Sequence, residues 1–278
     1  MNEATVDGRR ISFHEAGAGE PVLLLHPGFV ADGMLPLLGR PELAGFRLIA
    51  PHRSGYGASE PRPAPVAMGD LALELLGLMD QLGIGAAHAV GHSFGANVAL
   101  EACRIAPERF ASLALLEPPL GFFMSSEATG VITSVIGQAM QQFASGDVEA
   151  ASTTWLDGAF GPGWQQLLDQ RLPGASGQVV KDAPTALAVE GGALQTWQFG
   201  PADVGQISAP ILSVVHPQAG WTGFHEVHQG LVAASAEALE VELPSHLLQI
   251  LDPAPVAGGV ARFLSRHPIE SPTGTSAA

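Results

Sequence analysis

Two kinds of short apolar segment predict strands in the first 116 residues of the chain. Ile11 to Glu15 alternates apolar and polar side chains, which is typical of a half-buried strand. Val22 to His26 and Ala111 to Leu116 are almost entirely apolar, as expected for strands that are covered on both faces. Phe46 to Pro51 and Ala86 to Val90 predict two further strands of similar length.

Helical patterns separate these strands. Apolar residues recur at helical spacing between Val66 and Leu82, and Phe94 to Ile105 predicts a second helix. Strand and helix in alternation produce right-handed crossovers, so we predict an α/β fold with a mostly parallel central sheet and helices on both faces. The pattern resumes late in the chain, with strands at Pro210 to Val215 and Ala238 to Leu243 and helices at Gly223 to Ala234 and Pro255 to Ser265.

Residues 119–206 interrupt this alternation. They contain helical patterns, three of the four tryptophans and no convincing core strand. We interpret them as a helical cap inserted into one core domain made of residues 1–118 and 207–268, because a single core grows to about 250–300 residues. The small, polar segment 269–278 is expected to be disordered.

Composition restricts the partners of such a protein. The 278 residues are 46% hydrophobic, with a mean hydropathy of +0.24, a formal net charge of −15 and Lys181 as the only lysine. Nucleic acid and anionic membranes require clustered cations, so neither is expected as a partner. Without a signal-peptide pattern or an apolar run near about 18 residues, a cytoplasmic location is expected. Cys103, the only cysteine, forms no internal disulfide and is expected in the core.

The segment GHSFG, from Gly91 to Gly95, contains the clearest candidate for a catalytic residue. A G-x-S-x-G pattern between a strand and a helix places its serine on a strained turn, where larger residues in place of the glycines would collide with neighbouring backbone. The predicted strand before Gly91 and the predicted helix after Ser93 supply this context. The structural alternative is a Ser93 that only caps the helix.

A serine hydroxyl needs a base, and the base needs a carboxylate that orients it. Among ten histidines, His246 lies after the last predicted strand and just before the closing helix, which favours it as the base. His216 also follows a strand, and His92 is expected to point away from the turn. The alternative for His246 is a loop histidine without a catalytic task.

Several motifs between residues 11 and 266 resemble those of the α/β-hydrolase fold family. They are HPG after a strand, HRSGYGAS, which is similar to the family's R-G-x-G-x-S, the GHSFG turn, and LPSH before the final helix. The resemblance implies a capped hydrolase fold without a cofactor. Most members carry the catalytic acid after the strand that here reads ILSVV, but Ala219 and Gly220 occupy that neighbourhood.

The resemblance also implies a second position for the acid. A family subset that includes zearalenone-type lactone hydrolases and some haloalkane dehalogenases places it at the end of the strand after the nucleophile helix. Glu117 is the first polar residue there, which completes a predicted triad with Ser93 and His246. A carboxylate at this place is costly unless it is paired, and an imidazole N–H is a suitable partner. A purely structural Glu117, Asp252 as a cap of the closing helix, and Glu226 are the alternatives.

An oxyanion hole requires two backbone N–H donors. Phe94 follows the nucleophile directly and is the first expected donor. The resemblance places the second donor in the HPGF turn, at Gly28, with Phe29 close behind.

Metal and nucleotide sites are not expected from the remaining motifs. His225 and His228 form H-E-x-H, whereas the zinc-protease pattern is H-E-x-x-H with a further ligand. The glycines of RSGYG follow neither a Rossmann nor a P-loop pattern.

These residues predict a cofactor-independent serine hydrolase that cleaves a carboxylic ester or lactone through an acyl-enzyme. A cap rich in Trp, Phe and Met suggests an apolar or aromatic substrate, although such residues also pack a cap onto a core. The candidate contacts are Phe29, Met124, Trp155 and Trp197. Hydrolysis of a C–C bond in a diketone and non-catalytic ligand binding are the alternatives. The sequence leaves open whether the protein forms a homo-oligomer.

Overall fold

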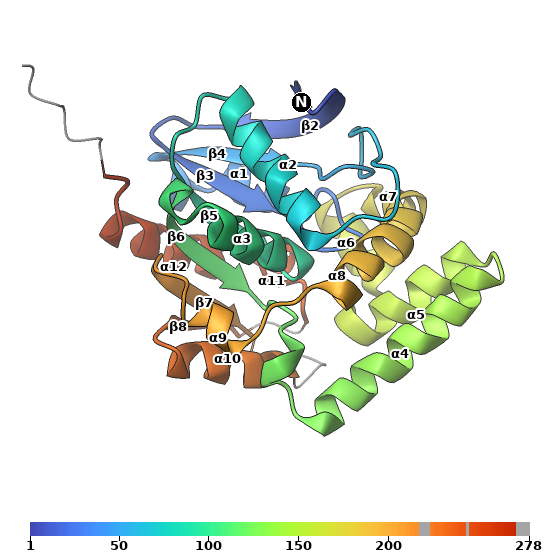
Figure 1. Cartoon of the computed structure of the whole chain (residues 1–278). Helices are drawn as coiled ribbons and strands as arrows, with labels where there is room; N and C mark the ends of the chain where they lie inside the picture. Colours follow the sequence, from blue (N-terminus) through green and yellow to red (C-terminus); the bar gives the residue numbers. More distant parts are fainter. Residues whose placement is uncertain (217–222, 243–244, 271–278) are drawn as a thin grey trace, which may run out of the picture.

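The sheet of this protein is mostly parallel. A computed structural model describes residues 1–216, 223–242 and 245–270 (Figure 1). The strand order is β1-β2-β4-β3-β5-β6-β7-β8, in which β2 runs antiparallel to both of its neighbours and all pairs from β4 to β8 are parallel. The strands are β1 (Asn2–Val6), β2 (Arg9–Ala16), β3 (Glu20–Leu25), β4 (Phe46–Pro51), β5 (Ala87–His92), β6 (Phe110–Leu116), β7 (Ile211–Val215) and β8 (Glu237–Glu240).

The predicted fold class is confirmed, and the differences lie at the edges of the sheet. β1 was not expected from the sequence, because only Val6 of its five residues is buried and its apolar pattern is weak. The last strand ends at Glu240 instead of Leu243, and Leu243 lies outside the described residues.

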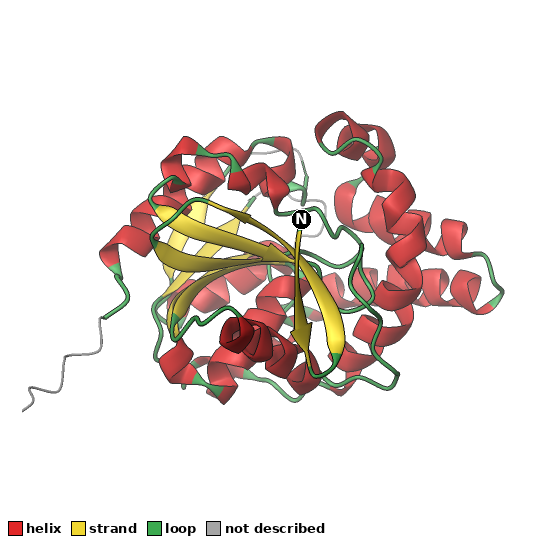
Figure 2. Ribbon diagram, turned by 90° about the horizontal axis from the view of Figure 1, so that it is seen from above, coloured by secondary structure: helices red, strands yellow, loops and turns green. Residues whose placement is uncertain are grey.

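Helices cover both faces of the sheet, as Figure 2 shows. Leu23 and Leu25 pack with the first group of helices, whereas Val22 and Leu24 pack with the second, as the alternation of side chains along a strand requires. Cys103 is buried in the first layer, as expected. The first group is α2 (Met68–Gln81), α3 (Phe94–Ile105) and α10 (Gly223–Ala233), and the second is α1 (Leu35–Leu38), η1 (Pro41–Leu43), α11 (Leu248–Leu251) and α12 (Pro253–Arg266).

Helices also fill the connection between β6 and β7, which we call the cap. Residues 119–206 are all described, and none of them belongs to a strand. The cap packs onto the core through a cluster in which Trp164 and Phe160 meet Phe29 and Tyr56. None of the described helices is long and apolar enough to cross a membrane. The cap elements are η3 (Gly121–Phe123), α4 (Ser126–Ala144), α5 (Val148–Phe160), α6 (Trp164–Arg171), α7 (Ala175–Pro184), η4 (Thr185–Glu190), α8 (Gly191–Thr196) and α9 (Pro201–Val204).

The register of β5 and β6 places the end of one strand beside the end of the other. His92 pairs with Leu116, so the next residues, Ser93 and Glu117, leave the sheet at the same level of its carboxyl edge. Ligands of open α/β sheets bind outside this edge. The segment after β3 and the residue after β7, His216, emerge at the same edge.

Candidate active site

Ser93 occupies a strained turn between β5 and α3. Its φ of 51° and ψ of −121° are rare for a residue with a side chain. A Cβ on Gly91 would lie 2.6 Å from the Cα of Ala96, and one on Gly95 would collide with the carbonyl oxygens of Leu25 and His26. Both glycines are therefore required by close packing. The side chain of Ser93 forms no capping hydrogen bond with the described residues of α3, so helix capping does not account for this serine.

The structure brings Glu117 and His246 together. A carboxylate oxygen of Glu117 contacts Nδ1 of His246, and both side chains are buried. The second oxygen, Oε1, accepts a hydrogen bond from the backbone N–H of His216 at 2.8 Å. Glu117 itself has a positive φ of 46°, and its N–H donates to the carbonyl of Val214 at 3.0 Å. The carboxylate is thus fixed from two sides.

Burial sets the charge state of this pair. Burial raises the pKa of Glu117, although the hydrogen bond from the N–H of His216 acts in the opposite direction. Burial also lowers the pKa of His246 below the ordinary 6.5. Burial therefore keeps the imidazole neutral. When Glu117 is ionised, Nδ1 of His246 carries the proton of this contact, and Nε2 is left with the lone pair of a base.

Aromatic rings fix the plane of the His246 imidazole. Phe224 stacks on it with the ring centroids 4.3 Å apart and an interplanar angle of 6°, and Phe160 lies at 5.9 Å. His92 was expected to point away from the turn, but its buried ring lies 4.7 Å from that of His246, and its Nδ1 pairs with Gln249 at 3.0 Å. The reason is the alternation along β5, which directs His92 to the sheet face that packs on α11 and α12.

A cavity of about 380 Å³ joins Ser93 and His246 to the cap. Its wall is mostly apolar, and Glu190 contributes a carboxylate. All twelve Lys and Arg residues of the chain are described, and none of them lines the cavity. The expected contact and oxyanion residues all line it: Gly28, Phe29, Phe94, Met124, Trp155 and Trp197.

The two expected oxyanion donors are neighbours in space. A Cβ on Gly28 would lie 4.0 Å from the Cβ of Phe94. Phe94 is the first residue of α3, and the first N–H groups of a helix have no partner within it. The N–H of Phe29 donates to the hydroxyl of Tyr56 at 3.3 Å, which favours Gly28 over Phe29 as the second donor.

The alternative acids have structural tasks. Asp252 caps α12, because its Oδ1 accepts a hydrogen bond from the N–H of Ala254 at 3.2 Å. Glu226 accepts one from the N–H of Ser125 at 2.5 Å. Ala219 and Gly220, in the place where most family members carry the acid, lie outside the described residues.

Two groups of described side chains offer closely spaced atoms that could bind a metal ion. One is His92, Glu117 and His246, in which Glu117 and Nδ1 of His246 already contact each other. The other is His14, Asp32 and His52, in which Nε2 of His52 pairs with Asp32 at 2.9 Å. The H-E-x-H histidines belong to neither group, with Nδ1 of His228 on the hydroxyl of Ser213 at 2.9 Å and His225 beside Gln229.

Sequence reasoning missed the residues that surround the HPGF turn. Arg53 and Tyr56 lie in the HRSGYGAS motif, which supported the family resemblance without giving a role to either residue. Both bind Glu190 of the cap, which is 137 and 134 positions away from them, respectively. No local pattern around Glu190 indicates this pairing.

Comparison with known proteins gives matches that cover parts of the chain. A family model described as alpha/beta hydrolase fold matches residues 21–171. A dihydrolipoyllysine-residue acetyltransferase component of an acetoin cleaving system, from Cupriavidus necator, is 40% identical over 121 residues, which are 43% of this chain and 32% of that protein. A 2-hydroxy-6-oxo-6-phenylhexa-2,4-dienoate hydrolase from Burkholderia cepacia is 34% identical over 123 residues, 42% of this chain and 43% of that protein. The chain thus matches less than half the length of these curated relatives.

Solved structures agree with the fold over nearly the whole chain. A thermophilic esterase from Thermogutta terrifontis superposes with a TM-score of 0.76 at 20% identity, covering 96% of this chain and 100% of that one. The similarity to zearalenone-type lactone hydrolases stays a prediction. The family match supports a hydrolase activity. Because the matched residues 21–171 are more than half of the 278 residues, the chain belongs to the alpha/beta hydrolase fold family.

Proposed function

We propose that this protein is a cofactor-independent serine hydrolase that cleaves a carboxylic ester or lactone of an apolar small molecule. One observation carries the proposal. Ser93 and His246 open into the same cavity, and Nδ1 of His246 is bound to the buried Glu117. This arrangement supports Ser93 as the nucleophile, His246 as its base and Glu117 as the acid that orients the base, which are the three roles that acyl transfer requires.

The proposed reaction has two halves. The hydroxyl of Ser93 attacks the ester carbonyl while Nε2 of His246 takes its proton, and Glu117 stabilises the imidazolium that forms. The N–H groups of Gly28 and Phe94 bind the oxyanion, and collapse of the tetrahedral intermediate releases the alcohol with the proton from His246. Water then attacks the acyl-enzyme with the same base and frees the acid.

The cavity wall favours a neutral substrate. The Burkholderia cepacia relative is named for a dienoate, which is a carboxylate. In this chain no Lys or Arg lines the cavity, and the arginine behind its wall, Arg53, is already paired with Glu190. An anionic acyl group would be desolvated there without a cationic partner. This supports an ester or lactone over a carboxylate-bearing substrate of C–C bond hydrolysis.

Strain at the site supports an enzyme over a non-catalytic binding protein. Among the described residues, five with side chains have a positive φ, and Phe29, Ser93 and Glu117 are three of them. Such conformations cost about 1–3 kcal/mol each and cluster at functional sites. A pocket that only binds a ligand has no need for a strained serine beside a buried carboxylate and imidazole.

The test is turnover of a panel of aryl esters, macrolactones and diketones by the purified protein, with Ser93→Ala as the control. We expect product from an ester or lactone only with Ser93. A fluorophosphonate probe should label Ser93 in the wild type and lose its reaction in His246→Ala. A panel without any product that depends on Ser93 would favour the binding protein instead.

A further inference from the structure

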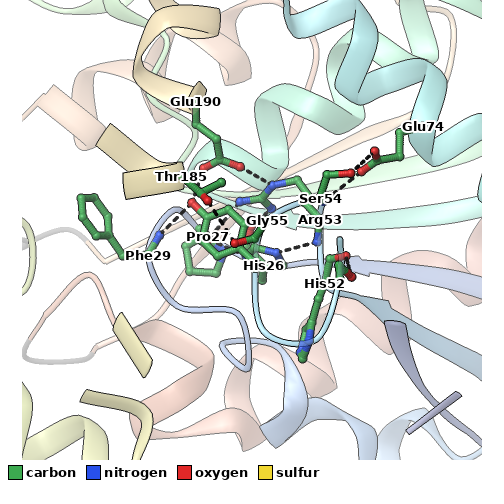
Figure 3. A network of polar contacts seen from close by, with 12 residues as sticks. His26, Pro27, Phe29, His52, Arg53, Ser54, Gly55, Glu74, Thr185 and Glu190 are labelled. Atoms are coloured by element: carbon green, nitrogen blue, oxygen red, sulfur yellow. Dashed lines mark hydrogen bonds and ion pairs between the residues drawn. The ribbon is translucent and has the colours of Figure 1, made fainter. Parts of the chain in front are cut away.

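The peptide group between Pro27 and Gly28 is held from its carbonyl side (Figure 3). The carbonyl oxygen of Pro27 accepts a hydrogen bond from Nη2 of Arg53 at 3.1 Å and another from Nδ1 of His26 at 2.7 Å. The N–H of the same peptide group belongs to Gly28, the proposed oxyanion donor. Because hydrogen bonds along a chain polarise one another, donors on the carbonyl make this N–H a stronger donor in a fixed direction.

Arg53 also holds the residue before this peptide group. Its Nη1 donates to the carbonyl oxygen of His26, and its backbone N–H donates to Nε2 of His26 at 3.1 Å. Since Nε2 accepts, Nδ1 of this imidazole carries the proton that is donated to Pro27. Burial lowers the pKa of His26 well below its ordinary value, which keeps the ring neutral, and the N–H of Arg53 on Nε2 selects this tautomer.

The residue after the peptide group is held through Tyr56. The hydroxyl of Tyr56 accepts the N–H of Phe29 at 3.3 Å and donates to Oε2 of Glu190 at 2.6 Å. Phe29 has a φ of 67°, a conformation that persists only where the surroundings impose it.

Glu190 of the cap supplies the countercharge for Arg53. Nε of Arg53 lies 2.6 Å from Oε1 of Glu190, and the two residues are only 5% and 3% exposed. A guanidinium buried to this extent is costly without a carboxylate. The cap is therefore part of the structure that keeps Arg53 on the HPGF turn.

We infer that Arg53 is a positioning residue for the oxyanion hole and that Glu190 of the cap keeps it in place. The inference rests on the proposed function, because it concerns the donor N–H of Gly28. The same guanidinium lies over the ring of Phe94, 5.2 Å from its centroid. It therefore contacts Phe94, one proposed donor, and Pro27, whose carbonyl shares a peptide group with the N–H of Gly28, the other proposed donor. Arg53 does not line the cavity, so it acts through the turn and not on the substrate.

Arg53→Lys tests this directly. Lysine keeps a positive charge beside Glu190 but lacks the planar fork that reaches two carbonyl groups at once. We expect kcat to fall about 10-fold to 100-fold, since a small misplacement of a catalytic group has effects of this size. Binding of a trifluoromethyl ketone, whose serine adduct carries an oxyanion, should weaken by the same factor. The KM should change little, because Arg53 itself does not line the cavity, and the pH profile should stay unchanged, because the pair of His246 and Glu117 is untouched.

Glu190→Gln should also lower kcat, and kcat is the readout for this variant because Glu190 itself lines the cavity. Glu74→Gln is its matched control. Glu74 is also buried and paired with a cation, Arg62 at 3.2 Å, and it accepts the N–H of Ser54 at 3.0 Å, but it contacts no residue of the HPGF turn among its hydrogen bonds. We expect Glu74→Gln to lose thermal stability as Glu190→Gln does and to keep the kcat of the wild type.

Tyr56→Phe keeps the test decisive if the charge variants do not fold, because it removes one hydroxyl and no charge. It should lower kcat several-fold and leave KM unchanged. A wild-type kcat in folded Tyr56→Phe or Arg53→Lys, or a loss no larger than in Glu74→Gln, would overturn the inference. Failure of the proposed function has a different signature, namely a wild type without any turnover that depends on Ser93.

Discussion

Glu117 and His246 are 129 positions apart, yet a carboxylate oxygen of the first meets Nδ1 of the second in a fully buried contact. The second carboxylate oxygen binds the backbone N–H of His216, the residue directly after β7. The strand that carries the acid in most family members thus contributes a backbone donor here, and the side chain comes from the neighbouring strand, β6. The imidazole is oriented from β6 while β7 still supports the site.

The pH dependence of kcat/KM should report the buried His246. The free enzyme needs a neutral imidazole as base, and burial lowers the pKa of His246 below 6.5. The neutral form therefore dominates above pH 6.5, and activity is lost as the pH falls below that value. We expect kcat/KM for a neutral ester to show an acid limb from His246 that is centred below pH 6.5. An acid limb centred above 6.5 would contradict this electrostatic account.

Gly95→Ala should destabilise the fold, because its methyl group would collide with two carbonyl oxygens of the β3 end. We expect a loss of about 3 kcal/mol or more, as for severe overpacking, which corresponds to a melting temperature lower by about 6 °C or more. Gly137→Ala is the control, since it lies in α4 with nothing within 4 Å of an added Cβ. It should stabilise the helix by about 0.5–1 kcal/mol. Equal melting temperatures for the two variants would show that Gly95 is not sterically required.

Trp155→Ala should weaken binding of an apolar aromatic ester. Trp155 lines the cavity, and its ring centroid lies 5.5 Å from that of Phe29. Loss of this apolar surface should raise KM about 10-fold while kcat changes little, because Trp155 is partly buried and apolar burial of this size contributes about 1.5 kcal/mol. Trp164→Phe, at a buried position outside the cavity wall, should lower stability without raising KM. A Trp155→Ala enzyme with unchanged KM would place the substrate elsewhere in the cavity.

The sequence predicted the layers of the fold because its central strands are mostly apolar runs and its helices have a strong period. It indicated Ser93 because the G-x-S-x-G pattern requires glycine at positions 91 and 95 for steric reasons, and that pattern is visible in the sequence alone. The buried orientation of His92 escaped prediction, since it depends on which sheet face meets α11 and α12. The ion pair of Arg53 with Glu190 escaped for a related reason: a buried pair across 137 positions leaves no periodic trace.

The measurement that tests the central claim most directly is kcat of Glu117→Gln beside that of Asp252→Asn. Glutamine keeps the size of the side chain but removes the charge that orients and stabilises the His246 imidazole. We predict a fall in kcat of about 100-fold to 10,000-fold for Glu117→Gln, as for loss of the acid in other triads. Asparagine still caps a helix, so Asp252→Asn should leave kcat unchanged. Full turnover by Glu117→Gln together with a large loss in Asp252→Asn would contradict the assignment of the acid to Glu117.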